Sequence, residues 1–222
     1  MQVVKSENSL RNALTLYAIL LVIWGFYRIL FKLPDYIEEL VFKPLLWLGA
    51  LYLFLQKEKA GPVGGFASVG WTAKNLFNSI YLGVGLGMVF AVVGIISNIF
   101  KYESIALANF GFTANSLLGG LSLSFITAVS EETVFRGYFL SRATKALKSE
   151  WSANILVSFG WVLIHLPVLF FVYDLSLSEL PARALLSFVF SLGAGFVYGR
   201  TGNILAPVLL NVFWSWPIIL FR

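Results

Sequence analysis

The chain has 222 residues, of which 59% are hydrophobic and only 12% are charged, with a mean hydropathy of +0.83 and a formal net charge of +5. Soluble domains carry about 25% charged residues, so this composition excludes a water-soluble globular domain and predicts a membrane protein. The positive charge is spread over separate loops, which argues against a nucleic-acid partner and fits lysines and arginines that face anionic lipid. The chain contains no cysteine, which excludes disulfides, thiol nucleophiles and zinc–thiolate sites.

About seven apolar stretches are long enough to be candidate membrane spans, judged against the ~20 apolar residues that cross the hydrocarbon core. The second stretch is short, and a glycine-rich segment, 57–70, follows it as the clearest loop. We therefore predict an all-α polytopic helical bundle that forms a single membrane domain. In chain order the predicted spans are 13–31, 41–55, 76–100, 116–140, 151–173, 180–199 and 204–221.

The lysines and arginines of the loops predict the orientation of the bundle. The N-terminus and every second loop after it carry more of these residues than the alternate loops do. Because cytoplasmic loops are enriched in lysine and arginine, we expect a cytosolic N-terminus and, for seven spans, an external C-terminus.

An acidic pair with a nearby arginine lies inside the fourth predicted span. A charge in hydrocarbon costs about 2.5–3.5 kcal/mol on insertion scales, so such groups indicate a functional site. Glu132 and Arg136 are spaced i,i+4, with the acid first, which favours an ion pair on one helix face. Glu131 is turned about 100° away and is free to face a cavity.

The histidine of the chain, His165, lies in the next predicted span. If these two spans form an antiparallel hairpin around Lys148, Glu131 and His165 lie at similar depth, ~20 Å from the turn. Polar residues share the face of each, and we expect the two polar faces to meet across a wet cleft that opens to the cytosol. These polar neighbours are Ser124 and Thr127 on one helix and Asn154 and Ser158 on the other.

A carboxylate beside a histidine suits general-base activation of water. Two plainer interpretations stay open: His165 as an interhelical hydrogen bond, and Glu132 with Arg136 as an internal clamp. A metal site is not predicted, because catalytic zinc normally takes three protein ligands and adjacent glutamates on a helix diverge. We expect no cofactor.

A third segment adds two polar groups. Asn211 and Ser215 follow the turn at 199–203 and share one face of the last predicted span. An amide and a hydroxyl there can donate hydrogen bonds to a developing oxyanion, although ordinary interhelical hydrogen bonding is the alternative.

The three segments together resemble the three motifs of the CPBP family, also called Abi. This family comprises type II CAAX prenyl endopeptidases and bacteriocin-processing or self-immunity proteins. The motifs are the E-E-x-x-x-R run at 131–136, the aromatic-x-x-x-His run that ends at His165, and the G-x-x-x-G-R-T-G-N-I-L-A-P-V-L-L-N run at 195–211. The resemblance covers residues 116–215, so we expect a core in 116–222 and peripheral helices in 1–115.

What the resemblance implies is an intramembrane glutamate protease. Glu131 would be the general base, His165 would help to polarise water, and Glu132 with Arg136 would order the site. In the family the third motif usually has a histidine followed four residues later by an asparagine, and both are proposed to stabilise the oxyanion. Asn211 and Ser215 occupy those positions here, and Trp161 replaces the usual phenylalanine of the second motif.

Two classes of function follow from this resemblance. The first is a peptidase that cleaves membrane-tethered or lipidated peptides near the cytosolic face. The second is a non-catalytic membrane scaffold or bacteriocin self-immunity protein. A transporter is a third option, since buried carboxylates can serve a proton relay. In each case the partners are the bilayer and a peptide or protein, and not a nucleic acid.

Overall fold

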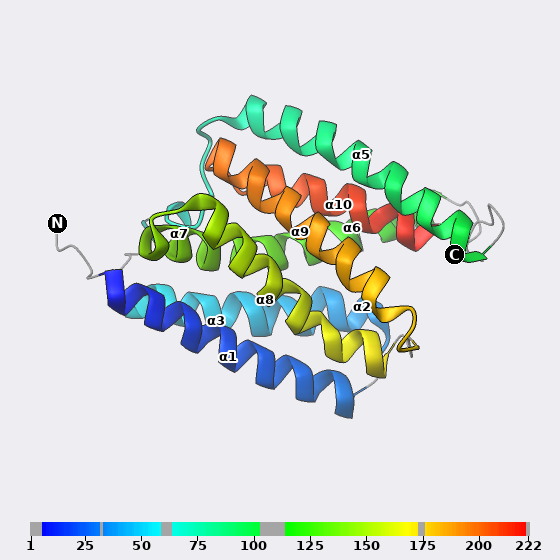
Figure 1. The fold of residues 1–222 in the computed structure, drawn as a ribbon, viewed down its shortest axis with the longest axis horizontal. Helices are drawn as coiled ribbons and strands as arrows, with labels where there is room; N and C mark the ends of the chain where they lie inside the picture. The colour runs from blue at the N-terminus through cyan, green and yellow to red at the C-terminus, as the bar shows by residue number, and fades with distance from the viewer. Residues whose placement is uncertain (1–5, 32, 59–63, 103–113, 173–175, 221–222) are drawn as a thin grey trace.

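The protein is a bundle of helices with no strand among the residues that the structure describes (Figure 1). The computed structural model describes residues 6–31, 33–58, 64–102, 114–172 and 176–220. Two segments, η1 and η2, have π-helical hydrogen bonding. In chain order the elements are α1 (Ser6–Leu30), α2 (Asp35–Ile37), η1 (Glu38–Phe42), α3 (Lys43–Lys57), α4 (Gly64–Ala67), α5 (Leu76–Tyr102), α6 (Ala114–Glu132), η2 (Thr133–Leu140), α7 (Ser141–Leu147), α8 (Glu150–Phe171), α9 (Leu180–Thr201) and α10 (Leu205–Leu220).

The prediction of an all-helical membrane protein is confirmed for this part of the chain. Four of its helices, α1, α5, α8 and α9, are long and apolar enough to cross a membrane. The other predicted spans correspond to α3, to α6 with η2, and to the shorter α10. The count of seven spans stays a prediction. Tyr173 and Phe221, which end two predicted spans, and 59–63 of the predicted loop lie outside the described residues.

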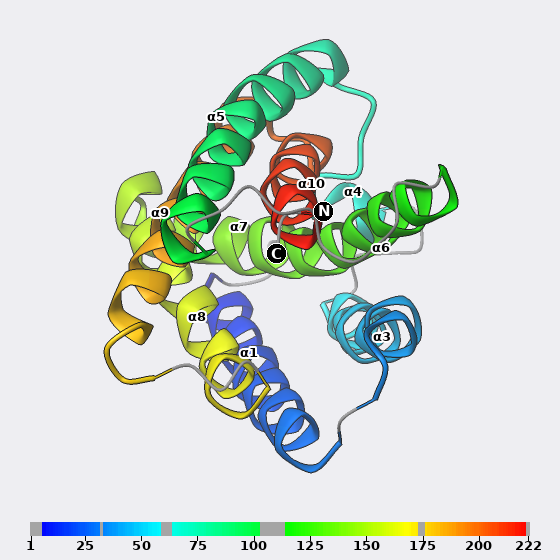
Figure 2. The same ribbon diagram turned by 90° about the vertical axis from the view of Figure 1, so that its right-hand side faces the viewer.

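The rod formed by α6, η2 and α7 runs through the middle of the bundle (Figure 2). Helices α5 and α10 pack together on one side of it, and α1, α3 and α8 lie on the other. Every residue of η2 is buried, with the ring of Phe135 packed edge-on against those of Phe139 and Trp161. The carboxylates of α6 therefore lie near the centre of the protein.

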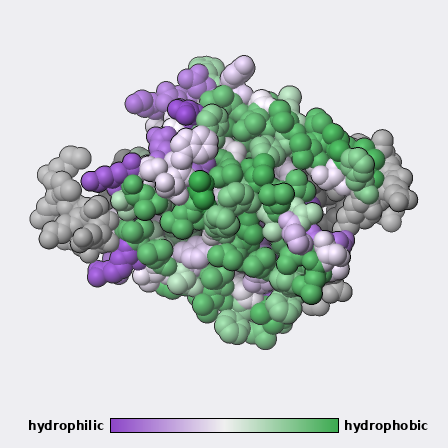
Figure 3. Space-filling model, viewed as in Figure 1, coloured by the Kyte–Doolittle hydropathy of each residue, from purple (hydrophilic) through white to green (hydrophobic). Residues whose placement is uncertain are grey.

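Hydrophobic side chains cover the middle of the face shown in Figure 3, and hydrophilic ones gather mainly toward the end where α7 lies. The apolar belt is what a bilayer core requires, because exposed apolar side chains there contact lipid instead of water. Large hydrophobic residues with exposed side chains include Phe26, Leu45, Phe77 and Phe100. The fold is therefore that of a membrane protein, as its composition predicts.

The turn between α9 and α10 sets the start of the helix that carries Asn211. Gly202 has a φ of 61°, the left-handed conformation that suits glycine at the end of a helix. The side-chain oxygen of Asn203 accepts a hydrogen bond from the Leu205 amide at 2.9 Å, and its Nδ2 donates to the Thr72 carbonyl at 2.7 Å. Gly202 and Asn203 of the third motif therefore have a structural role, since they end α9 and begin α10.

Close packing of α5 on α10 leads to a first prediction. A Cβ atom built on Gly83 would lie 2.6 Å from the Ala206 carbonyl oxygen, whereas one on Gly85 would meet nothing within 4 Å. Gly83→Ala should therefore destabilise the protein by about 1–3 kcal/mol, because the backbone of α10 must move. Gly85→Ala is the matched control in the same helix, with the same change in helix propensity. Equal unfolding midpoints for both variants in a detergent titration would contradict the packing described here.

Candidate active site

Four helices meet around the acidic pair. Glu131 and Glu132 end α6, His165 lies in α8, Asn211 in α10, and Lys43 begins α3. Glu131 is 5% exposed, Glu132 is fully buried, and Asn211 is 3% exposed. The structure therefore brings together Glu131, His165 and Asn211, the three groups that the sequence places on separate helices.

Glu131 is contacted through both of its carboxylate oxygens. Its Oε1 lies 3.6 Å from Nε2 of His165 and forms an ion pair with Nζ of Lys43. Its Oε2 accepts a hydrogen bond from Nδ2 of Asn211 at 3.3 Å. Glu131 and His165 thus lie at similar depth, as expected for a hairpin.

The ring of His165 has a defined orientation. Its Nδ1 lies 2.7 Å from the Trp161 carbonyl oxygen, and because a carbonyl only accepts, Nδ1 carries the proton. In the neutral ring Nε2 is then an acceptor, and it faces Oε1 of Glu131. The His165 side chain is 22% exposed and that of Glu131 6%, so the histidine is the more accessible member of the pair. A water molecule near both acceptors could donate one hydrogen bond to each.

Glu132 and Arg136 form the ion pair that their spacing predicts. Nη1 of Arg136 lies 3.1 Å from Oε1 and 3.0 Å from Oε2 of Glu132. Its Nη2 donates to the backbone carbonyl of Ser191 at 3.0 Å and to the Ser191 hydroxyl at 2.7 Å. The guanidinium also lies 4.4 Å from the centre of the Trp161 ring, a cation–π contact. Arg136 thus ties α6 and η2 to α8 and α9.

Asn211 joins the two carboxylates. Its amide donates to Oε1 of Glu132 at 2.7 Å as well as to Glu131. Ser215, by contrast, donates to the Asn211 backbone carbonyl at 2.9 Å and to that of Val212 at 3.5 Å. Serine in a helix often bonds to the carbonyl four residues back, and this bond turns the hydroxyl toward its own helix. The structure therefore does not bring Ser215 to the carboxylates.

The two polar faces that were expected to meet do so at Glu131 and His165, but not at their other polar residues. Thr127 donates to Oε2 of Glu39 at 2.8 Å, so its face of α6 is directed toward η1. Asn154 donates to the Leu192 carbonyl at 2.9 Å, and Ser158 lies 3.5 Å from Asn154, so this face of α8 is directed toward α9. For Thr127 and Asn154 the expectation was wrong, because elements outside the hairpin satisfy these polar groups.

Sequence reasoning missed Lys43 and Glu39, which lie at and just before the start of the short second predicted span. A signal for them is present in the sequence. Residues 38–43 read E-E-L-V-F-K, and residues 131–136 read E-E-T-V-F-R. In each run the second glutamate pairs with the base four residues later, and each run overlaps a π-helical segment. Whether 1–115 forms a separate part stays a prediction, but its helices are not remote from the site.

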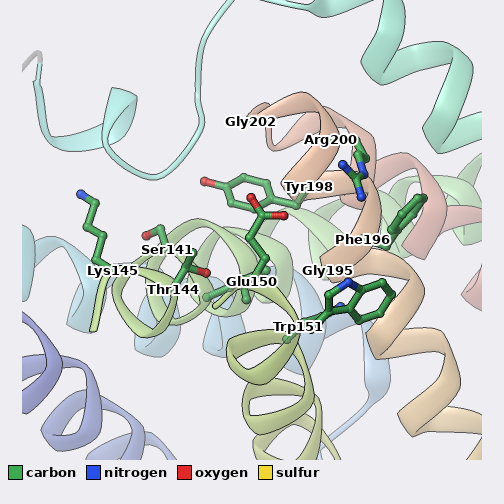
Figure 4. A pocket seen from close by; sticks show the side chains of 13 residues that line it. Ser141, Thr144, Lys145, Glu150, Trp151, Gly195, Phe196, Tyr198, Arg200 and Gly202 are labelled. Carbon is green, nitrogen blue, oxygen red and sulfur yellow. The ribbon is translucent and has the colours of Figure 1, made fainter. Parts of the chain in front are cut away.

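Neither Glu131 nor Glu132 lines either of two hollows in the described part of the chain. One, of 270 Å³, lies between the ends of α7 and α9 and the start of α8, where Glu150, Trp151, Tyr198 and Arg200 line it (Figure 4). The other is an apolar hollow of 640 Å³ between α6 and α10. Neither is the predicted cytosolic cleft to Glu131, and that cleft stays a prediction.

An all-helical membrane protein whose buried glutamate is directed at a histidine and an asparagine belongs, by its chemistry, among candidate intramembrane hydrolases. Within the described residues no group of three or more histidine, cysteine, aspartate or glutamate side chains is arranged to hold a metal ion. The family model of type II CAAX prenyl endopeptidase Rce1-like proteins matches residues 113–217. This match confirms the resemblance read from the three motifs. No curated protein and no solved structure matches the chain.

Proposed function

We propose that the protein is a glutamate-dependent intramembrane endopeptidase that cleaves membrane-tethered or lipidated peptides near the cytosolic face. The family match implies a CAAX-type intramembrane protease. The observation that carries the proposal is the 3.6 Å separation of Glu131 Oε1 and His165 Nε2 inside a buried site. When the ring is neutral, Nε2 of His165 and the carboxylate of Glu131 both accept hydrogen bonds, so one water molecule can donate to both. A general base must lie within hydrogen-bond reach of the proton that it removes, directly or through one water.

In the proposed reaction Glu131 takes a proton from a water molecule held between it and His165. The water oxygen forms a bond to the carbonyl carbon of the scissile peptide, whose oxygen becomes an oxyanion. An N–H of Asn211 moves from a carboxylate to that oxyanion, a role in which one donor is worth about 3–4 kcal/mol. The C–N bond then breaks, and the proton on Glu131 passes to the leaving nitrogen. Arg136 keeps Glu132 in place throughout.

A panel of peptides tests the substrate class. The purified protein in lipid nanodiscs is given C-terminally prenylated peptides, the same peptides without the lipid, and leader peptides attached to a membrane anchor. We expect cleavage of the lipidated or anchored peptides and little of the free ones, because tethering raises the local concentration at the membrane. Faster cleavage of the free peptides would contradict the proposed substrate class.

A second candidate function is a non-catalytic scaffold or self-immunity protein. The observation that favours it is that the donors beside Glu131 are already in use, with Asn211 bonded to both carboxylates and Lys43 paired with Glu131. A site with its charges balanced in this way can serve stability alone. The two candidates differ in whether the purified protein turns over any peptide.

Chelators test the metal-free mechanism. If Glu131 and His165 alone activate water, peptidase activity should survive a strong chelator and need no added zinc. The measurement is the initial rate before and after dialysis against the chelator, with a zinc-dependent protease as the positive control. Loss of the rate with recovery on adding zinc would replace this mechanism by a metal-assisted one.

A further inference from the structure

The ion pair between Lys43 and Glu131 joins the first part of the chain to the acidic pair of the second. Nζ of Lys43 contacts Oε1 of Glu131 and lies 2.8 Å from Oε2 of Glu39. The same oxygen of Glu39 accepts the hydroxyl of Thr127 at 2.8 Å. The ammonium is thus shared by one carboxylate from η1 and one from α6.

The surroundings of Lys43 are built to hold an ammonium. Its side chain is 5% exposed, and Nζ lies 5.5 Å from the Trp24 ring centre and 5.6 Å from that of Trp47. Burying a lysine is costly unless the charge is paired, and here two carboxylates and two aromatic faces surround it. Four elements, α1, η1, α3 and α6, supply these groups.

Arg28 of α1 extends this arrangement. Its guanidinium pairs with Glu38 and lies 3.4 Å from Oε1 of Glu39. Glu39 is therefore fixed on one oxygen by Arg28 and on the other by Lys43. A carboxylate held in this way has little freedom to turn, so it defines the position of the lysine that it binds.

Lys43 also differs from the other cation beside the acidic pair. The Nη atoms of Arg136 are committed to Glu132 and Ser191, so that arginine holds the second glutamate and not the first. Lys43 pairs with Glu39 of its own run, 38–43, and also with Glu131, the first glutamate of the run 131–136. With Lys43 on Oε1 and Asn211 on Oε2, the carboxylate plane of Glu131 is set relative to His165.

We propose that Lys43 is a positioning residue of the active site, held by Glu39, that fixes Oε1 of Glu131 opposite Nε2 of His165. The inference rests on the proposed peptidase function. If so, α1, η1 and α3 are part of the site, with Lys43 on Oε1 of Glu131 and Asn211 on Oε2.

Steady-state kinetics test the positioning role. Lys43→Met should lower kcat roughly 10²-fold with little change in KM, because a carboxylate misplaced by about 1 Å can cost that much while substrate still binds. Lys43→Arg should recover part of the loss, since it keeps the charge. Lys57→Met, which removes an exposed lysine at the end of the same helix, is the matched control and should leave kcat unchanged.

Folding is separated from positioning by a second variant. Lys43→Met leaves Glu39 and Glu131 without their shared cation and can lower stability. Lys43→Met/Glu39→Gln removes one charge of each sign, and it should fold while showing the same loss of kcat. An active wild type with an equally active Lys43→Met, or an equally active double variant, would overturn the positioning role and leave the proposed function standing.

A cross-link tests the juxtaposition without any activity. Because the chain has no cysteine, Lys43→Cys/Glu131→Cys carries a single thiol pair. A short bis-methanethiosulfonate reagent should join this pair in membranes and not the control pair Lys57→Cys/Glu131→Cys. Failure of the first pair to react would overturn the inference whatever the kinetics show. If the cross-link forms but the wild type cleaves none of the peptides, the proposed function is contradicted, and so is the positioning role that rests on it.

Discussion

Arg136→Met should lower the free energy of unfolding by about 3–5 kcal/mol, which is a large part of the stability of a typical domain. The reason is that Glu132, fully buried, would lose the guanidinium that contacts both of its oxygens. The backbone carbonyl and hydroxyl of Ser191 would lose their donor as well. An unpaired carboxylate inside the bundle is among the most costly defects that one substitution can create. The measurement is the unfolding midpoint in mixed micelles on titration with a denaturing detergent.

The matched control for this prediction removes both charges. In Glu132→Gln/Arg136→Met no ion is left unpaired, and replacing a buried ion pair by neutral groups is often close to neutral for stability. The double variant should therefore unfold near the wild-type midpoint while the single variant does not. If the two variants are equally destabilised, the loss comes from packing of the Arg136 side chain and the ion-pair argument fails.

Asn211→Ala should lower kcat roughly 10²- to 10³-fold while substrate still binds, because an oxyanion donor acts on charge that develops only in the transition state. The amide of Asn211 lies 2.7 Å from Glu132 and 3.3 Å from Glu131, close to where a carbonyl attacked by water beside Glu131 would lie. Asn211→His should keep or raise the rate, since it restores the residue usual in the family that the three motifs resemble.

This comparison is made on protein whose folding has been checked by its melting temperature. The alanine variant also removes a hydrogen bond to each carboxylate, so a collapsed site must be told apart from one that lacks a donor. A loss that appears in KM and leaves kcat unchanged would assign Asn211 to substrate binding. Equal rates for the wild type and the alanine variant would remove it from the reaction.

Much of the fold could be predicted because the apolar runs are long and their boundaries are polar. The hairpin of α7 and α8 around Lys148 is short, and the helix rise alone then places Glu131 and His165 at one level. The pair Glu132–Arg136 followed from i,i+4 spacing in the same way. These features depend on contacts that are local in sequence or span one turn.

Other features depend on helices that are distant in sequence, and the sequence pattern does not contain them. Lys43 lies at the start of a short apolar stretch, and it becomes part of the site because η1 and α3 pack against α6. Ser215 shares a face with Asn211, yet its hydroxyl turns to its own backbone. The π-helical segments were not foreseen either, since one extra residue in a turn leaves an apolar run apolar.

The central claim is that Glu131 is the base of a peptidase, and one comparison tests it most directly. Cleavage of a lipidated peptide in nanodiscs is measured for the wild type, for Glu131→Gln and for Glu150→Gln, which changes an exposed glutamate at the start of α8. We expect the wild type and Glu150→Gln to cleave at similar rates and Glu131→Gln to be slower roughly 10²- to 10⁴-fold, the range that general-base catalysis supplies. Equal rates for the wild type and Glu131→Gln would contradict the role of Glu131 as the base. No cleavage by a wild type that still binds a membrane partner would contradict the peptidase function and favour the non-catalytic scaffold.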